Sequence, residues 1–243
     1  DKPSAESEVF ELCQSGKQRR KNELFRRAED ITTKPVRLYE AGNGTQNSNE
    51  PKTDTMIKKE LLLGDEAIAW GALNAGLSGV YAYPGTPSTE ITEFIQMHPL
   101  TRERGIHCNW SANEKTALEA ALGMSFVGKR ALVCMKHVGM NVCADAFVNS
   151  AMTGANGGLV VVAADDPSMH SSQNEQDSRF YAKFAMIPCF EPASQQEAYE
   201  MIGEAFDFSE KYQIPVLMRV TTRMAHSRAM VEPREARSEN SLA

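Results

Sequence analysis

From residue 64 onward, apolar and polar positions follow two alternating patterns. Apolar residues at helical spacing mark five segments, and short unbroken apolar runs mark five others. The helical segments are residues 64–76, 89–98, 113–128, 141–152 and 194–212, and the apolar runs are residues 79–83, 106–110, 130–137, 158–164 and 215–220. Strands that are buried on both faces are apolar throughout, and their regular alternation with helices is typical of parallel sheets. The pattern predicts an α/β fold, a doubly wound and mostly parallel sheet with helices on both faces.

The first 55 residues follow neither pattern. Residues 11–31 combine a weak apolar stripe with a basic cluster, and residues 40–54 are rich in Gly, Asn, Ser and Pro, as linkers are. Acidic residues interleave with the basic cluster and no aromatic platform accompanies it, which favours a solvated helix face over a nucleic-acid surface. We expect an N-terminal extension and linker over 1–55, partly helical or disordered, a domain over 56–232 and a polar tail over 233–243.

Composition narrows the class of protein. The net charge of −6 argues against a polyanion binder, and no apolar run is long enough to cross a bilayer. The N-terminus lacks a signal-peptide core. The five cysteines lack the close spacing of a four-thiolate iron–sulfur site, with no CxxC pair, and their odd number argues against a disulfide framework. We expect a cytoplasmic protein that binds neither membrane nor nucleic acid and carries no iron–sulfur cluster on this chain.

In a doubly wound sheet, ligands bind at the carboxyl ends of the strands. That rule selects four loops, at residues 84–88, 111–114, 137–141 and 165–185. No Walker, GxGxxG, GxSxG or HExxH sequence is present, so the common nucleotide-binding and hydrolase signatures give no support.

The first two loops each allow two interpretations. In "YPGTPS", the prolines and Gly85 build a rigid turn, and Ser88 or Thr89 can simply cap the next helix. The same turn would hold the Thr86 hydroxyl at the ligand end of the sheet. In "SANE", Ser111 and Glu114 have the spacing of a capping box, whereas a functional Glu114 would point from the helix start toward a ligand.

The third loop places Lys136 and His137 at a strand end beside Gly139, where the backbone can approach a ligand closely. His137 is equally compatible with a structural and a functional role. Cys134 and Cys143 lie nearby, and buried small hydrophobic residues are the favoured interpretation over a reactive pair.

The fourth loop is long and polar, which favours a functional or a disordered segment. Arg179 and its neighbours suit a carboxylate or an amide. The adjacent Asp165 and Asp166 lack a third spaced ligand, so we expect no metal site on this chain.

Taken together, these loops resemble a known family. The segments "LLLGDEAIAWGALNAG", "YPGTPSTEI", "NEKTALEAALGMSFVGKRALVCMKHVGMNVCADAF" and "GGLVVVAADDPSMHSSQNEQDSRFYAKFAMIPCFEP" look like the N-terminal, pyrimidine-binding domain of the indolepyruvate ferredoxin oxidoreductase alpha subunit. The resemblance runs from about residue 56 to about residue 231. Several motifs in one order make it far more specific than any single motif.

The resemblance implies roles for particular residues. Glu114 matches the Glu that hydrogen-bonds the aminopyrimidine ring of thiamine diphosphate, so that the exocyclic nitrogen can take the proton from the thiazolium carbon. Pro84 and Gly85 would contact the cofactor, and Thr86 would face a 2-oxo acid. His137 and Arg179 are further candidates for the substrate pocket.

The resemblance also implies an enzyme that oxidatively decarboxylates indolepyruvate or another aryl pyruvate to an acyl-CoA. Ferredoxin would accept the electrons and coenzyme A the acyl group. The chain lacks the family's magnesium- and diphosphate-binding domain and its cysteine region, and residues 1–55 have no match. We therefore expect a diphosphate-binding domain or subunit, a second oxidoreductase subunit and the iron–sulfur clusters to come from elsewhere.

Two other hypotheses remain at this point. The chain could be a non-catalytic binding or regulatory module that retains the fold, in which case Glu114 would be dispensable. Alternatively, the basic N-terminal segment could be the working part, docking a protein or nucleic acid.

Overall fold

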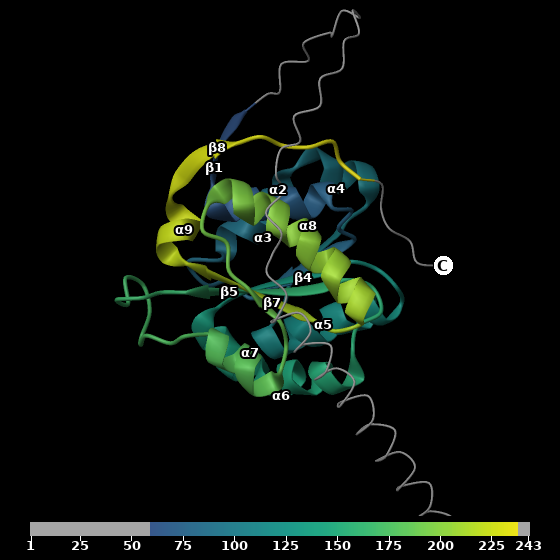
Figure 1. Cartoon of the computed structure of the whole chain (residues 1–243), viewed down its shortest axis with the longest axis vertical. Coiled ribbons are helices and arrows are strands. Elements are labelled where there is room, and N and C mark those ends of the chain that lie inside the picture. Colours follow the sequence, from purple (N-terminus) through teal and green to yellow (C-terminus); the bar gives the residue numbers. More distant parts are fainter. Residues whose placement is uncertain (1–58, 238–243) are drawn as a thin grey trace, which may run out of the picture. The chain divides into compact units, whose positions relative to one another are not determined.

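The computed structural model describes residues 59–237 and confirms the predicted α/β architecture (Figure 1). Six strands form one sheet in the order β3-β2-β4-β5-β7-β6, and every neighbouring pair in it is parallel. The strands are β2 (Gly79–Ala82), β3 (His107–Trp110), β4 (Ala131–Lys136), β5 (Leu159–Asp165), β6 (Cys189–Phe190) and β7 (Val216–Thr221). The chain runs outward from β2 to β3 and then returns to the other side of β2, which makes the sheet doubly wound.

Helices cover both faces of this sheet. The helices are α2 (Gly64–Asn74), α3 (Thr89–Met97), α4 (Pro99–Arg104), α5 (Glu114–Phe126), α6 (His137–Thr153), α7 (Arg179–Ala185), α8 (Gln195–Tyr212) and α9 (Thr222–His226). In Figure 1, α2, α3 and α8 lie on one side of the strands, and α6 and α7 lie on the other. Each predicted helix is present, whereas α4, α7 and α9 are short helices that the apolar pattern does not reveal.

Two apolar cores lie on the two sides of the sheet. Successive side chains of a strand point to opposite faces, and β4 shows this directly. Leu132 and Cys134 pack into the core under α2, α3 and α8, whereas Val133 and Met135 pack into the core under α5 and α6. All four side chains are fully or almost fully buried, which explains why the central strands are apolar without alternation.

A second, two-stranded sheet was not predicted. Its strands β1 (Glu60–Leu63) and β8 (Arg228–Val231) are antiparallel and come from the two ends of the described region. Beyond β8, the chain remains attached to the domain. The backbone of Arg237 donates to the carbonyl oxygen of Asn74 at 2.7 Å, and Arg234 donates to the Tyr199 hydroxyl at 2.7 Å. The first residues of the expected polar tail therefore pack along α2 and α8.

The predicted N-terminal extension, its basic cluster and the linker lie outside the described residues, so the proposed boundary near residue 56 remains a prediction. Within residues 59–237, no helix combines the length and apolar character that crossing a membrane requires.

Candidate functional site

The strand order creates one crevice at the carboxyl ends of the strands. The chain leaves β2 in one direction and β4 in the other, so the connections after these neighbouring strands diverge. In open α/β sheets, ligands bind in the crevice that such a topological switch point leaves. Two of the four predicted loops, those after β2 and β4, meet here.

The turn after β2 is rigid, as predicted. The Ser88 hydroxyl donates to the carbonyl oxygen of Gly85 at 2.8 Å, and the Gly85 amide donates to the Thr89 hydroxyl at 2.9 Å. The Thr86–Pro87 peptide bond is cis. Ser88 occupies the N-cap position of α3, but its side chain caps no helical amide, so the simple capping interpretation is wrong for Ser88. Its hydroxyl closes the turn instead.

This turn packs directly on the end of β4. A Cβ atom on Gly85 would lie 3.2 Å from the Cβ atom of Lys136, which is tighter than ordinary packing. Thr86 and Pro84 are exposed at the surface of the turn, and no described residue hydrogen-bonds the Thr86 hydroxyl. Thr86 therefore lies at the outside of the turn, whereas the Gly85 and Ser88 amides donate to acceptors within it.

The capping box expected for Ser111 and Glu114 is absent. The N-cap of α5 is Asn113, whose side-chain oxygen accepts from the Thr116 amide at 2.9 Å, and the Thr116 hydroxyl accepts from the Asn113 amide at 3.3 Å. Ser111 instead continues the strand pairing, because its amide donates to the Ala82 carbonyl oxygen at 2.8 Å. Glu114 is the first residue of the helix, and its side chain does not cap the helix.

The side chain of Glu114 is nearly buried yet remains available to a ligand. Its residue is 8% exposed, and no described residue donates a hydrogen bond to its carboxylate. Gly139, in the first turn of α6, makes room for it: a Cβ atom there would lie 2.6 Å from both Cγ and Oε1 of Glu114. Glycine at this position thus lets the start of α6 approach the carboxyl group closely.

The two cysteines near this site do not form a pair. Cys134 packs into the core on one side of the sheet and Cys143 into the core on the other. Burial raises the pKa of Cys143 to about 12, with the Glu114 carboxylate adding to the shift, and burial likewise raises the pKa of Cys134. Both therefore remain neutral thiols, consistent with buried hydrophobic residues rather than nucleophiles.

His137 begins α6 and is fully buried. Its Nε2 atom lies 3.0 Å from the carbonyl oxygen of Asn174, which can only accept, so Nε2 carries a hydrogen and donates. Its Nδ1 atom is buried without a partner among the described residues. Because Lys136 also donates to the Ser171 carbonyl oxygen, the end of β4 holds the loop that follows β5.

The aspartates that start this loop have structural partners. Asp165 accepts from Arg219 Nε at 2.7 Å and from the Ser178 amide at 3.1 Å. Asp166 accepts from the Ser172 hydroxyl at 2.6 Å and from the Thr222 hydroxyl at 2.8 Å. Their oxygens thus accept hydrogen bonds that hold the loop in place. Arg219, which donates one of them, was not identified from the sequence.

Arg179 lies at the start of α7, where the sequence analysis expected loop. Its guanidinium contacts the Asp177 carboxylate, with Nη2 to Oδ2 at 2.6 Å, and approaches Glu191 at 3.5 Å. Its side chain is 53% exposed. The neighbouring Glu191 pairs with Arg219 on β7, so Arg179 stands toward the β5, β6 and β7 ends of the sheet, not in contact with the turn at Thr86.

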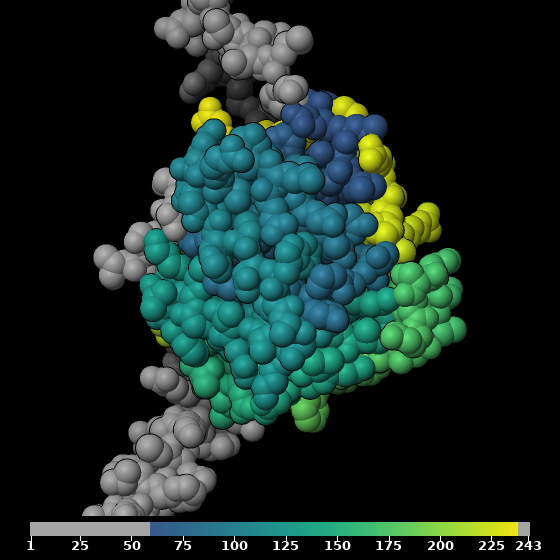
Figure 2. Space-filling view, turned by 180° about the vertical axis from the view of Figure 1, so that it is seen from behind, coloured from purple at the N-terminus to yellow at the C-terminus, as the bar shows by residue number. Residues whose placement is uncertain are grey.

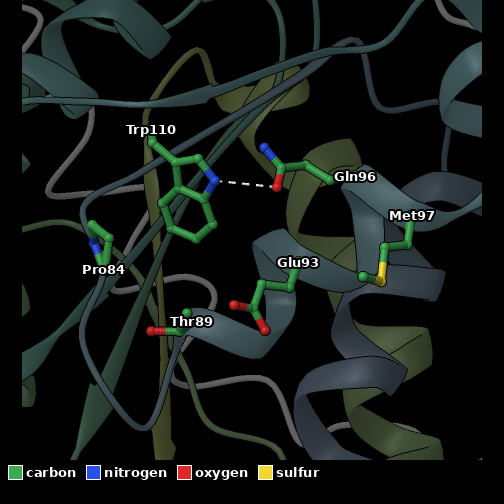
Figure 3. Close-up of a pocket in the computed structure, with 6 residues that line it drawn as sticks. All are labelled: Pro84, Thr89, Glu93, Gln96, Met97 and Trp110. Atoms are coloured by element: carbon green, nitrogen blue, oxygen red, sulfur yellow. Dashed lines mark hydrogen bonds between the residues drawn. The ribbon is translucent and has the colours of Figure 1, made fainter.

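A surface hollow of about 460 Å³ adjoins the turn (Figure 3). Trp110 and Gln96 face each other across it, joined by a hydrogen bond of 3.1 Å from Nε1 to Oε1. The hollow is lined by Pro84, Thr89, Glu93, Gln96, Met97 and Trp110. Glu114 is absent from this lining, so the hollow does not enclose the Glu114 carboxyl group. Figure 2 shows the opposite face to Figure 1, where residues from the first part of the described region form most of the surface and the loop after β5 lies at the edge.

Comparison with known proteins gives consistent matches. Residues 70–243 match the family described as pyruvate flavodoxin/ferredoxin oxidoreductase, thiamine diphosphate-binding. The indolepyruvate oxidoreductase subunit IorA of Pyrococcus horikoshii is 52% identical over 174 residues, covering 72% of this chain and 26% of that protein. The IorA subunit of Archaeoglobus fulgidus is 49% identical over 186 residues, covering 76% and 30%.

More distant relatives share the same region. The 2-oxoglutarate synthase subunit KorA of Methanothermobacter thermautotrophicus is 28% identical over 185 residues, covering 72% of this chain and 48% of that protein. The structure of a 2-oxoglutarate:ferredoxin oxidoreductase from Magnetococcus marinus, with 2-oxoglutarate, coenzyme A and succinyl-CoA bound, superposes with a TM-score of 0.63 at 19% identity over 73% of this chain and 32% of that chain. The chain thus spans about a quarter to a third of the length of the IorA subunits it matches.

Proposed function

Because the chain belongs to the thiamine diphosphate-binding family of pyruvate flavodoxin/ferredoxin oxidoreductases, we propose that it forms the aminopyrimidine half of a thiamine diphosphate site. The observation that carries the proposal is the Glu114 carboxyl group, which is nearly buried at a helix start and receives no hydrogen bond from a described residue. Burial of such a group costs free energy unless a ligand engages it.

The residues around Glu114 fit this cofactor. An aminopyrimidine is flat and offers ring nitrogens and an exocyclic amine, which suit a nearly buried carboxyl group. Gly139 leaves the space beside Cγ and Oε1 free of side chain, and the buried Nδ1 of His137 is a second polar atom without a partner among the described residues. When bound, thiamine diphosphate would supply the electron sink for decarboxylation of a 2-oxo acid. Glu114 would hydrogen-bond the ring and hold a proton there.

The turn after β2 would serve the substrate. Pro84 and Gly85 would lie against the cofactor, because the turn packs on the end of β4 where the switch-point crevice lies. Thr86 would donate its free hydroxyl to the 2-oxo acid. His137 would position the loop after β5 over the pocket, and Arg179 would pair with the substrate carboxylate by exchanging its contact with Asp177.

The overall reaction is part of the same proposal. Relatives named as indolepyruvate oxidoreductase subunits favour indolepyruvate or another aryl pyruvate, oxidised with ferredoxin as acceptor and coenzyme A as acyl acceptor. A diphosphate- and magnesium-binding domain, a second subunit and iron–sulfur clusters would come from other parts of the enzyme. Cys108, Cys134, Cys143 and Cys189 are all free thiols, in keeping with the cytoplasmic location expected from the sequence.

The test replaces Glu114 by Gln in the enzyme assembled from its native subunits. Glu119→Gln is the matched control, because Glu119 is an exposed glutamate of the same helix. We expect Glu114→Gln to lower indolepyruvate-dependent acceptor reduction by about 10²- to 10⁴-fold, the usual share of acid–base catalysis, and Glu119→Gln to leave it unchanged. Full activity of Glu114→Gln would overturn the proposal and favour a module that retains the fold without the catalysis.

A further inference from the structure

A second group of polar side chains lies away from Glu114, where three helices meet. Asp65 is in the first turn of α2, Glu90 is in the first turn of α3, and His226 is the last residue of α9. One ligand atom from each of the three lies within 4.8 Å of the others. His226 Nε2 and Glu90 Oε1 are 3.5 Å apart. Two oxygens and one imidazole nitrogen thus converge on one point.

Asp65 is the unusual member of this group. It is completely buried, and neither of its carboxylate oxygens has a hydrogen-bond partner among the described residues. One oxygen of Glu90, Oε2, is also buried without such a partner. Buried carboxylates are normally paired with a cation or hydrogen-bonded, because an uncompensated buried charge is costly. The group therefore lacks a positive partner that its chemistry calls for.

The surroundings increase that cost. Burial raises the pKa of Asp65 well above its usual range, and the negative charges of Glu90 and Glu66 raise it further. The position of each residue within its helix also matters. His226 is at the C-terminal end of α9, where the helix dipole favours a cation. Asp65 and Glu90 stand at helix N-termini, which favour their ionised forms.

We propose that Asp65, Glu90 and His226 bind a divalent transition-metal cation, with Zn²⁺ as the best fit. Zinc takes carboxylate and imidazole ligands in a tetrahedral arrangement, in which ligand atoms about 2.1 Å from the metal are ~3.4 Å apart. The 3.5 Å separation of His226 Nε2 and Glu90 Oε1 is already close to that value. The imidazole ligand favours zinc over magnesium, which prefers an all-oxygen shell. The proposal departs from the sequence-based expectation of no metal on this chain.

Such a cation would have a positional role. Glu90 follows directly after the turn that carries Thr86, and α9 follows directly after β7. The start of α2 already packs on α9, because a Cβ atom on Gly64 would lie 2.2 Å from the Met224 carbonyl oxygen. A metal ion held by all three helices would therefore tie the turn after β2 to the C-terminal end of β7.

The first measurement is the metal content of the purified 243-residue chain by mass spectrometry after dialysis against Zn²⁺, Mn²⁺ or Mg²⁺, followed by calorimetric titration. We expect one retained Zn²⁺ per chain, weaker Mn²⁺ binding and no retained Mg²⁺. His226→Gln removes a ligand at an exposed position and should weaken Zn²⁺ binding by at least about 100-fold, more than outer-shell changes do. His170→Gln is the matched control, because His170 is an exposed histidine outside the group.

Stability provides the second measurement. Zn²⁺ should raise the Tm of the wild-type chain and of His170→Gln, a chelator should reverse the rise, and neither should change the Tm of His226→Gln. Asp65→Asn should abolish Zn²⁺ retention in the same way. The proposal is overturned if the wild-type chain retains no metal, or if His226→Gln and Asp65→Asn retain as much as the wild type. Neither readout involves thiamine diphosphate, so failure here is distinguishable from failure of the proposed function.

Discussion

The connections after β3 and β4 and the longer connection after β5 all carry polar side chains. They differ in whether those side chains have hydrogen-bond partners within the protein. At the starts of α5 and α6, the Nδ1 atom of His137 is buried without a partner among the described residues, and the nearly buried Glu114 carboxylate accepts no hydrogen bond from one. In the loop after β5, Asp165 and Asp166 are buried and accept several hydrogen bonds each. Buried polar groups are normally hydrogen-bonded, so the groups without a partner are the candidates for binding a ligand, whereas the hydrogen bonds of Asp165 and Asp166 explain their burial structurally.

The largest expected effect is on stability and concerns the hydrogen-bonded aspartate Asp165. Replacing Arg219 by Met would leave the buried Asp165 carboxylate without its cation, which typically costs about 3–5 kcal/mol of the free energy of unfolding. Urea denaturation would measure it. Arg179→Met is the matched control, because Arg179 pairs with Asp177 at the surface and should cost less than about 1 kcal/mol. Equal losses in the two variants would mean that the loop does not depend on the buried pair.

Next to the Glu114 carboxyl group, which has no partner among the described residues, Gly139→Ala should reduce turnover more than stability. The new methyl group would lie 2.6 Å from Glu114 Oε1 and would push that side chain aside. A displacement of about 1 Å costs roughly 100-fold in turnover. Gly123→Ala in α5 is the control, because a methyl group there meets no atom within 4 Å and should leave turnover unchanged. Wild-type turnover by Gly139→Ala would separate Glu114 from the reaction.

A smaller effect is expected at the turn. Thr86→Val removes a hydroxyl that no described residue uses, so the Tm should remain unchanged. If the hydroxyl donates to the 2-oxo acid, kcat/KM should fall about 10-fold, the usual value of a hydrogen bond to a charged group. Thr153→Val, at the exposed end of α6, provides the control. A lower Tm with normal kcat/KM would assign Thr86 a structural role.

The smallest effect concerns the pH dependence of stability. Burial by itself would raise the pKa of Asp166, but hydrogen bonds from the Ser172 hydroxyl, the loop amides and Thr222 outweigh it and lower the pKa below its usual range. A depressed pKa contributes stability above the unfolded value of about 3.9, and that contribution is lost as the pH falls through the native pKa. Ser172→Ala should thus cost about 1 kcal/mol at pH 7.

The unfolded chains of the wild type and the variant titrate alike, so this cost should stay constant from pH 7 to about pH 4 and shrink only at lower pH, as the pH falls through the native pKa of Asp166 in the variant. Urea denaturation at pH 7, 5 and 3 would measure it, and both proteins should lose the stabilising contribution of Asp166 below about pH 4. A difference that already shrinks between pH 7 and pH 5 would contradict the assignment to Asp166.

The sequence was informative about the main sheet because its central strands are buried on both faces. The segment from Leu159 to Ala164 is apolar without interruption, so its place in a parallel sheet could be predicted. The strands β1 and β8 could not, since each has four residues and finds its partner at the opposite end of the described region. A local sequence pattern carries no information about which distant segment will pair with a strand.

The site was predictable in part for a similar reason. Glu114, the turn at Thr86 and His137 follow strand ends and could be identified one loop at a time. The capping box was wrong because Asn113 and Thr116 form the cap one residue before the helix, leaving Glu114 free. Asp65, Glu90 and His226 were missed because they are widely separated in the sequence and meet only when α2, α3 and α9 pack together.

The most direct test of the central claim is hydrogen–deuterium exchange at the thiazolium carbon of thiamine diphosphate bound to the assembled enzyme, followed by NMR after acid quenching. If the Glu114 carboxyl group prepares the cofactor, Glu114→Gln should slow the exchange by at least about 100-fold while Glu119→Gln exchanges at the wild-type rate. Equal exchange rates in the wild type and Glu114→Gln, with the cofactor bound to both, would contradict the account.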